Sequence, residues 1–252
     1  MDIKETDILG EDAGNHWYYR SKAQAVERCL RGIAFDTVLD VGAGSGYFSR
    51  HLLTRTSARA AYCVDPNYAH EWRELVAGKP LTFLRNTEAV SANLVLLMDV
   101  MEHVDDDVAL LREYAQKSLP TASFLISVPA FQWLWSAHDD FLGHRQRYTL
   151  PHLESVVRSA GLEVVHGNYY YGGIFPLAAA VRLLRRGKPK DAPVSSDLRR
   201  HSRLINSALL GLCHAELALM KHNRAFGLTV FCLARRNDAA AAQVHSASAR
   251  GT

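Results

Sequence analysis

The chain has 252 residues, of which 48% are apolar, and its formal net charge is +3. A chain of this length and composition can bury the core of one α/β domain with an additional segment, which argues against two full domains. The net charge is too small to favour nucleic acid as a partner.

The cysteines and the first residues predict a reduced, cytoplasmic protein. Cys29, Cys63, Cys213 and Cys232 lie far apart and form no C-x-x-C pair, so we expect free thiols and no disulfide framework. The acidic start lacks the basic flank and the apolar stretch of a signal peptide. No apolar run reaches the roughly eighteen residues that a membrane span needs.

A helix near the N-terminus is the first predicted element. Residues 1–15 are polar and are expected to cover the site or to remain mobile. The segment His16-Trp17-Tyr18-Tyr19-Arg20-Ser21 then leads a helix to about residue 31. Its apolar face comprises Ala23, Ala25, Val26, Cys29 and Leu30. We group residues 1–33 as an N-terminal cover and helix.

A buried strand that runs into alternating glycines is the clearest motif. Residues 38–41 are apolar and β-prone apart from Asp40, and Gly42-Ala43-Gly44-Ser45-Gly46 leads into a helical pattern over 46–55. Glycine permits positive φ in a tight turn and lets the backbone approach a ligand closely. A dinucleotide site needs its last glycine where Tyr47 stands, so the spacing argues against a pyrophosphate site.

Two further predicted strands end in carboxylates. Residues 60–64 are apolar, and Asp65 follows them about twenty residues after the glycines, where a nucleotide fold binds ribose hydroxyls. The alternative is that Asp65 only starts a turn with Pro66 and Asn67. Residues 94–104, Leu-Val-Leu-Leu-Met-Asp-Val-Met-Glu-His-Val, contain a strand that ends in Asp99 and is followed by a turn.

In this order the three motifs resemble those of class I S-adenosylmethionine (SAM) methyltransferases. The third resembles the D-V-L-E-H-V signature of the branch with the ubiquinone-biosynthesis O-methyltransferase and the malonyl-carrier methyltransferase of biotin synthesis. The resemblance implies SAM as cofactor and S-adenosylhomocysteine as product. It also implies the cofactor-binding residues Asp40, Gly42, Ala43, Gly44, Gly46, Asp65, Pro66, Asp99 and Val100.

The same resemblance places the N-terminal helix over the SAM pocket. Tyr19 would then lie beside the cofactor, and Arg20 would pair with the methionine carboxylate, which a planar guanidinium suits. The alternative for Arg20 is a surface arginine beside core aromatic residues. Relatives carry an acid after the third strand for the adenine amino group; this chain has Arg85-Asn86-Thr87-Glu88 there, and Asn86 is our candidate.

The remaining pattern predicts a doubly wound α/β fold. We expect strands at 35–41, 59–65, 81–84, 94–98 and 122–128, and helices at 46–55, 68–76 and 105–118. The acids at 105–107 are interpreted as a helix cap rather than a metal cluster. Connections of helical length call for a parallel sheet with helices on both faces, and we assign residues 34–173 to this SAM-binding core.

Residues 129–148 form a long loop that resembles a P-x-x-W-L-W-S-x-H-D-x-x-x-G-H-x-R-R-Y pattern of uncharacterised bacterial relatives. Ligands of doubly wound sheets bind at the carboxyl ends of strands, so we expect the methyl acceptor here. The candidate catalytic residues are His138, the first choice for a general base, His144, the second, Arg145 and Tyr148. Arg145 and Arg147 would suit an anionic acceptor.

Two alternatives stay open for this loop. Its histidines, acids and arginines could bond to one another and close the site without proton transfer. A metal site of His138, Asp139 and His144 is the other, but their spacing matches no standard ligand set, so we predict no metal.

The last third of the chain predicts a helix at 149–160, a strand at 162–171 and a seventh strand at 226–234 antiparallel to the sixth. Between them, 174–222 is a helical insertion with apolar segments at 174–184 and 204–220. Three roles suit this insertion: a lid over an apolar acceptor, a homodimer contact, or a basic amphipathic surface that rests on an anionic membrane. We favour the lid. Residues 223–236 hold the final strand, and 237–252 read as a disordered tail.

The sequence thus predicts a SAM-dependent methyltransferase with a seven-stranded, mostly parallel sheet. The acceptor would be a small or lipid-like molecule methylated at oxygen. The alternatives are a SAM-fold protein that catalyses another step or binds SAM structurally, and a peripheral membrane-binding module that acts through residues 174–222.

Overall fold

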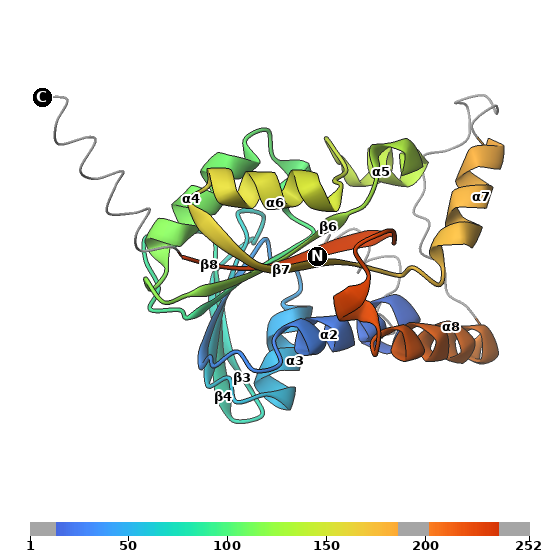
Figure 1. Cartoon of the computed structure of the whole chain (residues 1–252). Helices are drawn as coiled ribbons and strands as arrows, with labels where there is room; N and C mark the ends of the chain where they lie inside the picture. Colours follow the sequence, from blue (N-terminus) through green and yellow to red (C-terminus); the bar gives the residue numbers. More distant parts are fainter. Residues whose placement is uncertain (1–13, 186–201, 237–252) are drawn as a thin grey trace, which may run out of the picture.

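A single mixed sheet forms the centre of the computed structural model, which describes residues 14–185 and 202–236 (Figure 1). Within these residues the sheet has eight strands in the order β3-β4-β2-β1-β5-β6-β8-β7. The strands are β1 (Thr37–Val41), β2 (Ala60–Val64), β3 (Trp72–Val76), β4 (Lys79–Leu84), β5 (Leu94–Met98), β6 (Ser123–Pro129), β7 (Leu162–Tyr170) and β8 (Thr229–Arg236).

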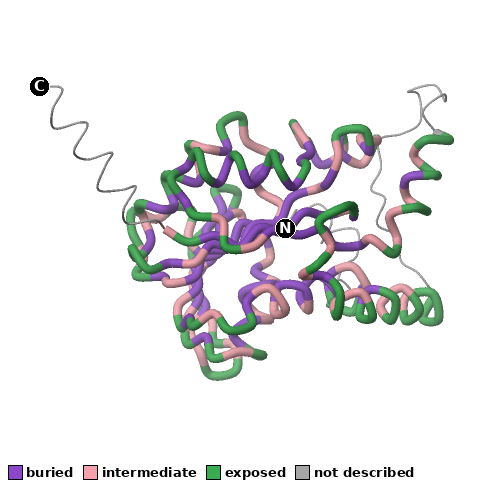
Figure 2. The backbone as a smooth tube through the Cα atoms, viewed as in Figure 1, coloured by how far each residue is buried: buried purple, intermediate pink, exposed green. Residues whose placement is uncertain are grey.

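Helices cover both faces of this sheet (Figure 1). One face carries α2 (Trp17–Cys29), α3 (Tyr47–Arg55) and α8 (Arg203–Glu216), and the other carries α4 (Asp107–Lys117) and α6 (Leu150–Ser159). The helices α5 (Ala137–Leu142) and α7 (Phe175–Arg185) lie beyond the sheet. The connections contain the 3-10 helices η2 (Met101–His103), η3 (Gln132–Leu134) and η4 (Met220–His222). Buried residues follow the strands between the two helical layers, as Figure 2 shows.

The strand pairing agrees with the predicted α/β class. The pairs β2–β4, β1–β2, β1–β5 and β5–β6 are parallel, so the carboxyl ends of these strands meet at one edge. The last strand, β8, runs antiparallel between β6 and β7, as the sequence predicted for the seventh strand. The Rossmann-like fold is therefore confirmed, with one more strand than expected.

The additional strand is β3, because the predicted helix at 68–76 is wrong. Trp72 to Val76 pairs antiparallel with β4, and Ala77 and Gly78 make the two-residue turn with φ of 52° and 76°. Positive φ at both turn positions is the geometry that joins a tight hairpin. The strand is held by Trp72, whose ring stacks on Phe83 with centroids 4.0 Å apart.

Both apolar segments of the insertion are helical. The first is α7, and the second is α8, which ends at Glu216 rather than near residue 220. α8 packs on the sheet edge and on α2, since Tyr170 donates to the Cys213 carbonyl and Asn206 accepts from the Trp17 amide. Among the described residues, no helix combines the length and apolarity needed to span a membrane. The expected N-terminal cover at 1–13, the middle of the insertion at 186–201 and the tail at 237–252 lie outside the described residues.

Candidate cofactor and acceptor site

The glycine loop turns sharply between β1 and α3. Gly42, Gly44 and Gly46 have φ of 62°, 52° and 71°, a region that side chains disfavour. A Cβ on Gly42 would lie 2.7 Å from a methyl of Val100, and one on Gly46 would lie 2.9 Å from the Phe83 ring. These two glycines are thus required by close packing against Val100, which follows β5, and Phe83 of β4, as well as by the turn.

Asp65 lies beside the loop, at the carboxyl end of β2. Its carboxylate accepts hydrogen bonds from the amides of Gly44 at 3.1 Å and Asn67 at 3.0 Å. Asp65 therefore makes the turn contact that was the alternative reading, and it also braces the glycine loop. The Tyr68 hydroxyl donates to the Gly44 carbonyl at 2.6 Å, which fixes the same turn.

The other residues predicted to bind the cofactor differ in exposure. Asp40 is buried beneath the loop and accepts from the Ser49 hydroxyl at 2.8 Å. Burial raises the pKa of Asp40 to about 6, despite the opposing hydrogen bond from Ser49. Ala43 is buried, whereas Pro66 and Asn86 are exposed, and the Asn86 side chain accepts from the Thr87 amide.

A buried lysine meets Asp99 at the end of β5. Lys22 of α2 is fully buried, and its ammonium donates to Asp99 and, at 3.2 Å, to the Tyr18 hydroxyl. Asp99 also accepts from Ser127 at 3.1 Å. Burial opposes ionisation of Asp99, but Lys22 outweighs it and holds the pKa below its ordinary value. Lys22 was not among the site residues predicted from the sequence; its position among the small and apolar residues of α2 was the available signal.

Three strained residues mark the same edge of the sheet. Asp99, Phe131 and Tyr171 follow β5, β6 and β7 and have φ of 56°, 58° and 64°. Non-glycine residues in this region cost free energy and cluster at functional sites. The strain therefore coincides with the edge where ligands of doubly wound sheets bind.

The loop at 129–148 is ordered around Asp139 of α5. Asp139 is fully buried; it accepts from Arg147 Nε at 2.6 Å and Nη2 at 3.0 Å, and from the Ser136 amide at 2.8 Å. His144 Nδ1 lies 2.8 Å from the same carboxylate. Burial alone would raise the pKa of Asp139, but the bonds from His144 and Arg147 lower it below its ordinary range.

His144 lies close to Glu102 and His103 of η2. One nitrogen or oxygen atom of each of Glu102, His103 and His144 lies within 4.8 Å of the others. The His103 and His144 ring centroids are 4.9 Å apart, and that of His138 is 6.5 Å from His144. Burial, followed by the nearby charge of Asp99, raises the pKa of Glu102 well above its ordinary value. Glu102 was quoted in the sequence motif but not selected as a site residue.

Arg145 and Tyr148 hold the loop against the rest of the fold. The Arg145 amide donates to the Glu102 carbonyl at 2.7 Å, and its exposed guanidinium pairs with Asp105. Tyr148 is fully buried and its hydroxyl donates to Asp107 at 2.9 Å. Burial and the Asp107 carboxylate raise the pKa of Tyr148 far above its ordinary value. Both contacts agree with the closing role that stood as the alternative to catalysis.

Tyr19 and Arg20 lie on different sides of α2. Tyr19 is buried, with its ring centroid 5.5 Å from that of Tyr47 at the start of α3. Arg20 is exposed and lines an open hollow with Glu27, His51 and Arg55. The helix thus turns Lys22, not Arg20, toward Asp99.

A comparison with family models decides the family. Residues 15–167, more than half of the chain, match the family described as Methyltransferase domain. The chain belongs to this methyltransferase family. No match was found among curated proteins.

Solved structures share the fold of this methyltransferase at low sequence identity. A chain of the complex between the Haloferax volcanii Trm112 methyltransferase activator and a methyltransferase is 16% identical, with a TM-score of 0.54 over 92% of this chain and 95% of that one. A Galdieria sulphuraria protein described as a sarcosine dimethylglycine methyltransferase is 15% identical, with a TM-score of 0.51 over 88% and 86%. The pyocyanin biosynthetic protein PhzM is 16% identical, with a TM-score of 0.50 over 94% and 62%.

The family assignment makes SAM the cofactor, and the residues of the glycine loop fit it. Gly46 precedes the first residue of α3 and has no side chain to cap the first amides of the helix, which leaves donors for a carboxylate or other anion. Asp65 adds a carboxylate at the strand end where a nucleoside fold binds ribose. The loop, the helix start and Asp65 thus match the chemistry of an adenosyl amino acid.

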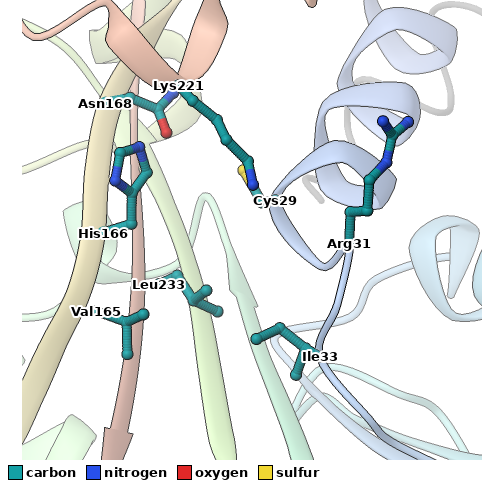
Figure 3. Close-up of a pocket in the computed structure, with 8 residues that line it drawn as sticks. All are labelled: Cys29, Arg31, Ile33, Val165, His166, Asn168, Lys221 and Leu233. Atoms are coloured by element: carbon teal, nitrogen blue, oxygen red, sulfur yellow. The ribbon is translucent and has the colours of Figure 1, made fainter.

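A pocket of about 270 Å³ lies away from this site, between α2 and the β7 edge of the sheet. Figure 3 shows Lys221 of η4 reaching toward Cys29 at the end of α2, with His166 on the β7 side of the pocket. Burial raises the pKa of Cys29 to about 12, which leaves a protonated, weakly reactive thiol. This pocket is mostly apolar and contains none of the residues predicted for SAM or the acceptor.

Proposed function

We propose that this methyltransferase transfers the methyl group of SAM to an oxygen of a small or lipid-like acceptor held by the loop at 129–148. The observation that carries the proposal is that one segment contacts both the glycine loop and the loop at 129–148. Gly42 packs on Val100, and Arg145 of the 129–148 loop donates to the carbonyls of Glu102 and His103, two and three residues further along. The branch that shares the D-V-x-E-H-V signature includes an O-methyltransferase, which supports oxygen as the reacting atom.

The chain's own residues would position the acceptor and remove its proton. The sulfonium of bound SAM supplies the leaving group, so the protein has to orient an acceptor oxygen and exclude water. Asp139 and Arg147 fix the shape of the loop, and the half-buried His138 is our candidate for the base. A histidine titrates near neutral pH, which suits proton removal from an acidic hydroxyl such as a phenol.

Exposed apolar side chains of the insertion support a lipid-like acceptor. On α7 these are Leu177, Val181 and Leu184, exposed by 68%, 37% and 81%; on α8, Leu204 and Ile205 are exposed by 84% and 51%. Neighbouring exposed apolar side chains of this kind mark binding surfaces. α7 also lies against the acceptor loop, since Arg182 donates to the Leu134 carbonyl and Phe175 packs on Trp133. An acceptor panel should therefore include long-chain phenols in micelles.

Asp65→Ala is expected to weaken binding of S-adenosylhomocysteine about 10- to 100-fold, because it removes charge-assisted hydrogen bonds to a ribose. Isothermal titration calorimetry measures the affinity. Glu88→Ala, which removes an exposed acid from a neighbouring loop, is the control and should leave the affinity unchanged. Equal affinities of the two variants would contradict a ribose contact by Asp65, provided that both proteins melt at the wild-type temperature.

His138→Gln is expected to lower turnover about 100-fold or more and to leave the affinity for S-adenosylhomocysteine unchanged, because a general base acts on the acceptor alone. Release of S-adenosylhomocysteine with a phenolic acceptor panel measures turnover. His152→Gln, on the exposed surface of α6, is the control. An unchanged rate in His138→Gln would remove this residue from the chemistry. If the wild-type protein binds SAM yet methylates no acceptor, the result would favour the alternative that it catalyses a step other than methyl transfer.

A further inference from the structure

Glu102, His103 and His144 are brought together from two segments that are already fixed. Glu102 and His103 form the end of η2, and His144 follows α5. The Arg145 amide donates to the Glu102 carbonyl at 2.7 Å, and Arg145 Nε donates to the His103 carbonyl at 2.9 Å. These backbone contacts align the two segments, so the three side chains meet without the help of a ligand.

Glu102 lacks a hydrogen-bond partner where one is needed. Its side chain is completely buried, and neither carboxyl oxygen has a partner among the residues that the structure describes. Buried polar groups are satisfied in most proteins, and an exception needs an explanation. Lys22 does not supply the partner, since its ammonium bonds to Asp99 and Tyr18. A cation between Glu102 and the two histidines would.

His144 is oriented as metal-binding histidines usually are. Its Nδ1 bonds to Asp139, which Arg147 and the Ser136 amide hold in place. A histidine that binds a metal through one nitrogen commonly donates the other ring N–H to a carboxylate, which fixes the tautomer and the ring. With Nδ1–H on Asp139, the lone pair of His144 is on Nε2.

We propose that Glu102, His103 and His144 bind a divalent transition-metal ion. Two imidazoles and one carboxylate suit Zn²⁺, Fe²⁺ or Mn²⁺ and leave coordination positions open. The three ligand atoms lie within 4.8 Å of one another. Metal–ligand bonds of roughly 2.0 to 2.2 Å would require these atoms to move closer together, and small side-chain rotations can provide this. No metal was predicted from the sequence, because His138, Asp139 and His144 lie together in one loop, whereas Glu102 and His103 are about 40 residues away along the chain.

The site has a role in the proposed function, on which this part of the inference rests. Val100, which packs on Gly42, lies two residues before Glu102, so the ion would be held beside the glycine loop. An open position on the ion would bind the acceptor oxygen and favour its deprotonated form. His138, which is not one of the ligands, would remain to take up the proton.

Co²⁺ is the probe for the test, because its visible absorption reports the ligands around it. The full-length protein is treated with a chelator, dialysed, and titrated with Co²⁺ in the absence of SAM and acceptor; competition with Zn²⁺ follows. We expect one ion per chain with an absorption band in the visible region. Glu102→Gln, His103→Gln and His144→Gln should each weaken binding at least ~10-fold.

His152→Gln is the matched control, since it removes an exposed histidine outside the cluster, and its Co²⁺ affinity should equal that of the wild type. No Co²⁺ band in the wild type, or equal affinities in the wild type and the three ligand variants, would overturn the proposal. Circular dichroism of each variant separates lost ligation from lost folding, and Glu102→Gln keeps the shape of the side chain. Because the titration contains neither SAM nor acceptor, its failure leaves the proposed methyl transfer untouched, and failure of methyl transfer leaves the metal site standing.

Discussion

Arg147→Met is expected to destabilise the protein by about 3–5 kcal/mol, because it leaves the charge of Asp139 buried without its main partner. Arg147 and Asp139 have side chains that are 4% and 0% exposed, so water cannot replace the lost guanidinium. Arg147 also donates to the Ala130 carbonyl at the base of the loop. Urea unfolding followed by circular dichroism measures the loss.

Arg145→Met provides a control two residues away in the same loop. The Arg145 guanidinium pairs with Asp105 and donates to the His103 carbonyl, but the Arg145 and Asp105 side chains are 52% and 79% exposed, and such exposed contacts contribute about 1 kcal/mol or less. Adding Asp139→Asn to Arg147→Met removes the stranded charge and should restore part of the stability, roughly 0.5–3 kcal/mol. Similar losses in Arg147→Met and Arg145→Met would show that the buried pair does not hold the loop.

The parallel core could be predicted because its signals are local. Each strand is a short apolar run, and the glycines after β1 and the acids after β2 and β5 follow their strands directly in the sequence. β3 was missed because Trp72, Leu75 and Val76 have a spacing that also fits a helix. The hairpin depends on Ala77 in a left-handed conformation, which alanine disfavours and a sequence pattern does not reveal.

The polar contacts of the site were less predictable because they join distant segments. Lys22 and Asp99 are separated by 77 positions, and which side of α2 faces the sheet is decided by tertiary packing. Tyr18 stacks on Tyr171, with ring centroids 5.6 Å apart, and this contact sets the rotation of the helix. In contrast, Asp139, His144 and Arg147 lie within nine residues, and their mutual bonding was foreseen as an alternative to catalysis.

Lys22→Met is expected to weaken binding of S-adenosylhomocysteine about 10- to 100-fold, a larger effect than that of Arg20→Met. The Lys22 ammonium has three N–H donors, and the structure assigns them two acceptors, Asp99 and the Tyr18 hydroxyl. We expect the third to contact the methionine carboxylate, because Asp99 directly precedes Val100, which packs on the glycine loop. A charge-assisted hydrogen bond of about 1.5–3 kcal/mol gives the stated range.

5′-Methylthioadenosine separates this contact from a general loss of structure. It keeps the adenosine and the sulfur but has no amino-acid carboxylate, so Lys22→Met should bind it as tightly as the wild type does. Calorimetric titration of both ligands into both variants gives the comparison. Weak binding of S-adenosylhomocysteine by Arg20→Met, with normal binding by Lys22→Met, would restore the assignment that the sequence suggested. Loss of both ligands in Lys22→Met would instead mean that the ion pair with Asp99 supports the whole pocket.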